Sequence, residues 1–140
     1  MTYAKLQRSG ILAAAAGWTL LIPLMSLLPP SFFSAVGSLG KVEGADKIIH
    51  SFIYGIQTAL LIAAWPHLFN VPSASRMAVA CAAGASAYGF LMELLQRTLT
   101  VCREFSWGDV LANTVGALIA AALAAIVLRL RPPVSRQWRS

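Results

Sequence analysis

The chain has 140 residues, of which 58% are hydrophobic and only 11% are charged, and its mean hydropathy is +0.70. An ordinary soluble domain carries about 25% charged residues, so this composition excludes one and indicates an integral membrane protein. The net charge of +6 would suggest a nucleic-acid partner for a soluble protein, but in a membrane protein it bears on orientation, and we expect no nucleic acid.

Four apolar segments follow one another along the chain. A helix needs about 17–25 residues to cross the hydrocarbon core, and we predict spans at residues 11–28, 47–65, 76–97 and 109–129. They occupy most of the sequence, so we expect one all-α domain over residues 1–140, a polytopic bundle of four transmembrane helices. The first span follows Lys5 and Arg8, which leaves a cleaved signal peptide as the alternative, although its apolar run exceeds the usual h-region of about 7–15 residues.

The charged residues are divided between the two sides of the predicted spans. One side carries seven basic residues and no acid: Lys5, Arg8, Arg76, Arg129, Arg131, Arg136 and Arg139. The other side has four basic residues and all five acids: Lys41, Lys47, Arg97, Arg103, Glu43, Asp46, Glu93, Glu104 and Asp109. By the positive-inside rule we predict a bacterial cytoplasmic (inner) membrane protein with both termini in the cytoplasm and the acids facing outward.

Small residues in the last two spans predict places where helix backbones approach closely. They are Gly84, Ala85, Gly89, Gly116 and the run Ala120–Ala125.

Polar residues recur at helical spacing on three of the predicted helices, near the same ends of the spans. Residues three and four apart share one helix face, and the three stripes are Asp46-His50-Tyr54-Gln57, Glu93-Gln96 and Asp109-Asn113-Gly116. At a rise of about 1.5 Å per residue, Tyr54, Glu93 and Asn113 fit within one leaflet. The sequence therefore predicts a shallow polar pocket at the outer face, whereas a channel or transporter would need polar residues deeper in the helices.

Glu93 is the costliest of these residues, because an unpaired carboxylate in hydrocarbon costs several kcal/mol. We expect it to be partly buried with a partner such as His50, Arg97 or Arg103. A purely structural interpretation remains open: Asp46 and Asp109 could cap helices, and the polar groups could cross-link the bundle.

The ordered motifs resemble those of the VanZ-like family of small bacterial membrane proteins over most of the chain. They are Asp46-Lys47-Ile48-Ile49-His50 followed by Tyr54, then Gly89-x3-Glu93-x2-Gln96, then Arg103-x-Phe105-Ser106-x2-Asp109-x3-Asn113-x2-Gly116. Two departures are Val101-Cys102, where the family often has a proline before the arginine, and Ala120 in place of a further glycine. These departures bear on the conformation of the loop more than on the chemistry.

The resemblance implies a role in the cell envelope, in a family named after a protein linked to resistance to the glycopeptide teicoplanin. It also implies a relation to enzymes that exchange or cleave phosphate-linked lipid headgroups. The partners would then be membrane lipids or a lipid-linked cell-wall precursor. The alternative function is a non-catalytic membrane protein that binds a lipid headgroup, a cell-wall precursor or a glycopeptide.

In the enzyme hypothesis, a lipid headgroup phosphotransferase or hydrolase, the catalytic residues are His50, Glu93 and Asp109. His50 would act as acid/base or nucleophile, with Glu93 orienting it, and Arg103 would hold a phosphate in a bidentate fork. The substrate-binding set is Asp46, Lys47, Tyr54, Gln96, Arg103 and Asn113. We expect no cofactor and no metal, although Asp46, His50, Glu93 and Asp109 have the donor types that suit Mg²⁺ or Mn²⁺.

Overall fold

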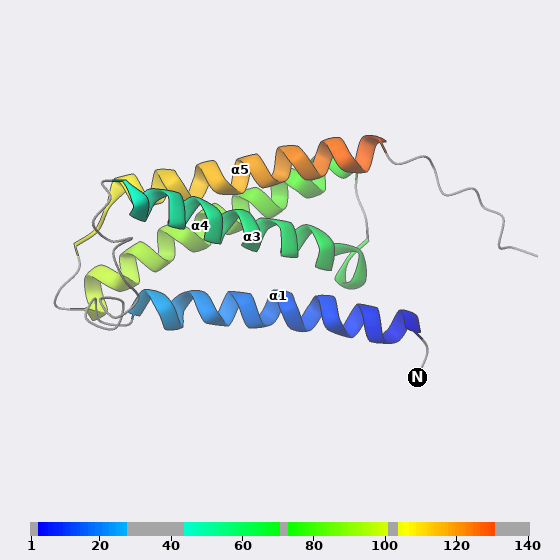
Figure 1. Ribbon diagram of the computed structural model, residues 1–140, viewed down its shortest axis with the longest axis horizontal. Coiled ribbons are helices and arrows are strands. Elements are labelled where there is room, and N and C mark those ends of the chain that lie inside the picture. Colours follow the sequence, from blue (N-terminus) through cyan, green and yellow to red (C-terminus); the bar gives the residue numbers. More distant parts are fainter. Residues whose placement is uncertain (1–2, 28–43, 71–72, 101–103, 131–140) are drawn as a thin grey trace, which may run out of the picture.

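Four long helices make up the regular structure in the computed structural model, which describes residues 3–27, 44–70, 73–100 and 104–130. They are α1 (Tyr3–Leu27), α3 (Ala45–Leu68), α4 (Ala74–Leu99) and α5 (Trp107–Leu130). The helices extend along the length of the molecule, with α4 inclined to α1 and α5 (Figure 1). Each is long and apolar enough to cross a membrane. The predicted all-α, four-helix membrane bundle is therefore confirmed, and the chain is a multi-pass membrane protein.

The helices extend beyond the predicted spans because helical structure does not stop where the apolar residues stop. α1 begins at Tyr3, two turns before the predicted span, and includes Lys5 and Arg8. α3 follows Gly44, whose φ of 82° is the left-handed conformation that glycine adopts without strain. Ser106 precedes α5, and its Oγ accepts a hydrogen bond from the backbone N–H of Asp109 at 3.2 Å.

The capping roles considered for two aspartates are thus wrong. Gly44 stands at the N-cap of α3 and Ser106 has the cap position of α5, so Asp46 and Asp109 lie inside the first turns of their helices. A carboxylate in a first turn still interacts favourably with the helix dipole. Both side chains are consequently available for contacts with other helices.

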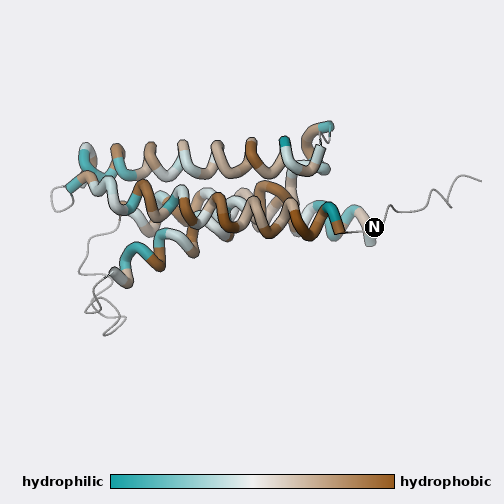
Figure 2. Tube along the Cα trace, turned by 90° about the horizontal axis from the view of Figure 1, so that it is seen from above, coloured by the Kyte–Doolittle hydropathy of each residue, from teal (hydrophilic) through white to brown (hydrophobic). Residues whose placement is uncertain are grey.

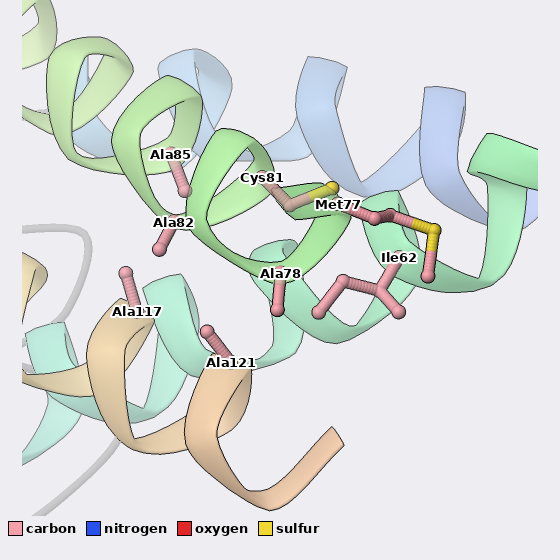
Figure 3. Close-up of a cluster of buried hydrophobic side chains, with 8 residues drawn as sticks. All are labelled: Ile62, Met77, Ala78, Cys81, Ala82, Ala85, Ala117 and Ala121. Carbon is pink, nitrogen blue, oxygen red and sulfur yellow. The ribbon is translucent and has the colours of Figure 1, made fainter. Parts of the chain in front are cut away.

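The apolar core is built mainly from small residues (Figure 3). Its buried members are Ile62 on α3, Met77, Ala78, Cys81, Ala82 and Ala85 on α4, and Ala117 and Ala121 on α5. Lipid tails are as apolar as these side chains, so association of the helices depends on close van der Waals packing, which small side chains permit. α5 packs extensively against both α3 and α4 as a result.

α1 packs on α3 and, over a smaller area, on α4, and polar contacts hold it there. Trp18 Nε1 donates to Ile53 O at 3.1 Å, and Tyr88 Oη donates to Thr19 O at 2.7 Å. No water is present in the hydrocarbon core to compete for these groups, so each contact specifies how α1 docks.

The two ends of the bundle differ in charge. The start of α3, the end of α4 and the start of α5 meet at one end, here called the acidic end, where Asp46, Glu93, Glu104 and Asp109 lie. Arg8, Arg76 and Arg129 lie near the opposite end, the basic end. Hydrophilic residues gather toward both ends of the bundle, and hydrophobic residues fill the length between them (Figure 2). The predicted grouping of the acids is confirmed for the described residues.

Candidate functional site: a polar cluster at the acidic end

The site begins with an unusually close approach of α5 to α3. A Cβ atom on Gly116 would overlap the backbone carbonyl of Ser51, so only glycine fits at this position. One turn closer to the acidic end, Ser51 Oγ donates to Ala112 O at 2.9 Å and ties the two helices together. The close contact brings the neighbouring residues His50 and Asn113 within reach of each other.

α4 approaches the same point through Gly89. A Cβ atom there would lie 2.8 Å from Asn113 Nδ2 and 3.0 Å from a ring carbon of Tyr54. The missing side chain therefore leaves room for Asn113 and Tyr54 against α4. Of the glycines predicted to permit close packing, Gly89 and Gly116 do so, whereas a Cβ atom on Gly84 would meet nothing within 4 Å.

His50 lies at the centre of the cluster, between Asn113 and Asp109. Its Nδ1 is 3.0 Å from Asn113 Oδ1, and its Nε2 is 3.8 Å from Asp109 Oδ2. The carbonyl oxygen of Asn113 can only accept, so Nδ1 donates in this contact, and Nε2 is the ring nitrogen that faces Asp109. Asn113 is buried, whereas the His50 side chain retains 21% of its exposure.

Glu93 is almost fully buried, with 2% exposure, which is more complete than the partial burial expected. Its Oε2 accepts a hydrogen bond from the backbone N–H of Ser106 at 3.2 Å. Because Ser106 also caps α5 through Asp109, this contact links the end of α4 to the start of α5. The three predicted catalytic residues, from three different helices, thereby come together: one ligand atom each of His50, Glu93 and Asp109 lies within 4.8 Å of the others.

Lys47 supplies a positive charge at the edge of the cluster. Its Nζ is 2.9 Å from Asp46 Oδ2 and 3.7 Å from Asp109 Oδ1, and its stem passes over Gly108. The side chains of Lys47 and Asp46 are about half exposed, whereas that of Asp109 is only 18% exposed. Asp46 is therefore the partner of Lys47 and lies outside the inner cluster, which consists of His50, Glu93 and Asp109.

The remaining predicted binding residues are dispersed. Tyr54 is buried beneath the cluster, with its ring centroid 6.4 Å from that of Tyr88. Gln96 is also buried, but its Nε2 donates to Ser26 O at 3.0 Å, so it fastens α1 to α4. Arg103 lies outside the described residues.

Two site residues were not among those predicted. Ser106 had a detectable signal, because a serine three residues before an acid is a capping pattern. Ser51 had none, since a single serine in an apolar run is common in membrane helices.

An aromatic group also borders the cluster: the rings of Phe90, Phe105 and Trp107 lie 5.0–6.3 Å apart at the acidic end, and Trp107 is exposed. Such rings are typical of the membrane–water interface.

A groove of about 600 Å³ lies elsewhere, between α4 and α5. Small apolar residues line most of it, and it extends toward Ser75 and Arg129, whose side chains are hydrogen-bonded at 2.6 Å. No residue of the cluster lines this groove. The groove and the cluster are therefore separate features of the molecule.

The fold and the cluster together define a class: a multi-pass, four-helix membrane protein with histidine and two carboxylates gathered near one end of the bundle. No protein-family model, curated protein or solved structure matches the chain.

Proposed function

We propose that this protein is a VanZ-like protein of the bacterial cytoplasmic membrane that acts on phosphate-containing lipid headgroups or lipid-linked precursors from the outer face. One observation carries the proposal: His50 is held by Asn113 through one ring nitrogen while the other is left toward Asp109, with Glu93 beside them. A histidine held in this way can exchange a proton with a reacting group.

The chemistry follows from the roles of these side chains. Nε2 of His50 takes the proton of an acceptor hydroxyl as that oxygen forms a bond to phosphorus. The bond between phosphorus and the headgroup oxygen breaks, and this departing oxygen receives the proton from the His50 imidazolium. The acceptor is an alcohol in a transferase and water in a hydrolase. The carboxylates of Glu93 and Asp109 stabilise the imidazolium that forms in between.

Binding of the substrate phosphate is assigned to cations at the same end. Lys47 is half exposed next to Asp109, and Arg103 follows from the family resemblance. The aromatic group of Phe90, Phe105 and Trp107 supports a position near the headgroup layer, where lipid phosphates lie.

The orientation is tested by labelling single cysteines with a membrane-impermeant maleimide in cells. In a background with Cys81 and Cys102 replaced by alanine, we expect Ser38→Cys to react in intact cells and Gln137→Cys to react only after permeabilisation. The seven-to-four excess of basic residues is the physical reason. The opposite pattern would place the acidic end in the cytoplasm and remove the outer-face assignment.

The function itself is tested with purified protein in nanodiscs that contain phospholipid labelled in the headgroup, such as phosphatidylglycerol. We expect time-dependent release of the label to water or its transfer to an added alcohol. Binding without release over long incubation would leave the non-catalytic alternative, a receptor for a lipid headgroup, a cell-wall precursor or a glycopeptide. Failure to bind any anionic lipid would contradict the enzyme and the lipid-headgroup receptor, and would leave only the glycopeptide receptor.

A further inference from the structure

Three side chains with metal-binding chemistry converge from three different helices. His50, Glu93 and Asp109 each offer one ligand atom, and these atoms all lie within 4.8 Å of one another. Ligands bound at about 2.1 Å to one octahedral cation lie roughly 3–4.2 Å apart. The observed spacing thus needs only small side-chain movements to reach that of a shared ion.

The environment of the histidine matches that of a metal ligand. A metal-bound imidazole donates its second ring N–H to an oxygen acceptor, which fixes the tautomer and leaves the other nitrogen to bind. Asn113 Oδ1, on a side chain with 1% exposure, stands at the corresponding distance of 3.0 Å from His50 Nδ1. Nε2 is then the nitrogen left toward Asp109.

Asp109 provides a second, independent observation. Its Oδ1 is buried and has no hydrogen-bond partner among the described residues, because the nearest cation, Lys47 Nζ, is 3.7 Å away. A buried carboxylate oxygen without a hydrogen bond carries a desolvation cost. A bound cation would remove this cost.

From these observations we infer that His50, Glu93 and Asp109 form a binding site for one divalent cation of the Mg²⁺/Mn²⁺ class. Two carboxylates balance the charge of the ion, and oxygen ligands with a single imidazole suit Mn²⁺. The structure selects three of the four residues considered from the sequence, since Asp46 is half exposed and paired with Lys47. Only the ion's purpose rests on the proposed function. With the ion bound, Nε2 of His50 would be a ligand and could not take a proton, so the ion would activate the attacking water or alcohol in its place and would neutralise the lipid phosphate.

Lys47 gives the inference a distinctive consequence. Its ammonium group faces the same carboxylate of Asp109 as the cation would, so the two positive charges oppose each other. Removing this charge with Lys47→Met should tighten cation binding, by about 1.5-fold to fivefold for a partly exposed pair. A merely structural cluster predicts no such gain.

The test uses the full chain, stripped with a chelator and placed in nanodiscs of phosphatidylcholine. Mn²⁺ is the probe, and its binding is measured from the loss of the free-ion signal in electron paramagnetic resonance. We expect one Mn²⁺ per chain, with affinity lowered at least about tenfold in Asp109→Asn and Glu93→Gln. The matched control is Asp46→Asn, which removes a neighbouring acid outside the inner cluster and should leave one Mn²⁺ bound.

A second measurement needs no variant: the bound Mn²⁺ should show ¹⁴N modulation from the His50 imidazole in electron spin-echo spectra. Absence of saturable binding, absence of nitrogen coupling, or equal loss in Asp46→Asn and Asp109→Asn would overturn the inference. These readouts do not depend on lipid turnover. If the protein binds Mn²⁺ but never transforms lipid, the enzyme proposal alone is contradicted. If turnover persists in chelator and no Mn²⁺ binds, the metal site alone is contradicted.

Discussion

Gly116→Ala is expected to force α3 and α5 apart and to lower the apparent melting temperature of the protein in detergent by roughly 5–10 °C. The new Cβ would overlap the backbone carbonyl of Ser51, and a backbone group in a helix cannot rotate away as a side chain can. Overpacking of this kind costs about 1–3 kcal/mol. The displacement would also stretch the contact between His50 and Asn113, which lies one turn from Gly116.

Gly84→Ala is the matched control, because it makes the same chemical change on α4 where a Cβ atom meets nothing within 4 Å. It should leave the melting temperature unchanged or raise it slightly, since alanine favours helix more than glycine does. Equal melting temperatures for the two variants would show that α3 and α5 tolerate separation and that their close approach does not position the site.

His50→Gln is expected to reduce lipid headgroup turnover by at least about 100-fold while leaving lipid binding nearly unchanged. General acid–base catalysis contributes about 10²–10⁴ in rate, and glutamine retains polarity and similar length but cannot exchange a proton at neutral pH. Binding should persist because the phosphate contacts are assigned to Lys47 and Arg103. Headgroup release and lipid binding are measured on the same nanodisc preparations.

His67→Gln is the matched control for that variant, because His67 is the chain's second histidine and lies at the basic end of α3, away from the cluster. It should retain wild-type turnover. If His50→Gln also retains turnover, His50 is not the acid/base, and the cluster would return to a role in binding or in holding the helices together.

The helices were predictable from the sequence because each apolar run is long enough to need its own crossing of the hydrocarbon core. The gathering of the acids at one end was predictable for the same reason. Successive crossings alternate in direction, so the start of α3, the end of α4 and the start of α5 must meet on one side. Neither prediction required knowledge of how the helices pack.

Which partners the polar residues of α3 contact depends on how the helices pack, and the sequence does not show it. Helical spacing placed Asp46, His50 and Gln57 on one face, but Asp46 and Gln57 are three turns apart. At the acidic end this face carries the exposed pair of Asp46 with Lys47, one turn further in it meets α5, and deeper still Gln57 hydrogen-bonds Thr19 of α1. A shared face therefore did not make these residues one site.

Periodicity specifies the direction of a side chain around its own helix axis, and this direction was predictable for His50, Glu93 and Asp109. It does not specify how neighbouring helices rotate and cross. Those quantities depend on where backbones can touch, and here the contact of Gly116 with Ser51 and the space left by Gly89 decide them. The convergence of the three side chains follows from that packing, and so does the hydrogen bond of Gln96 to Ser26 O on α1.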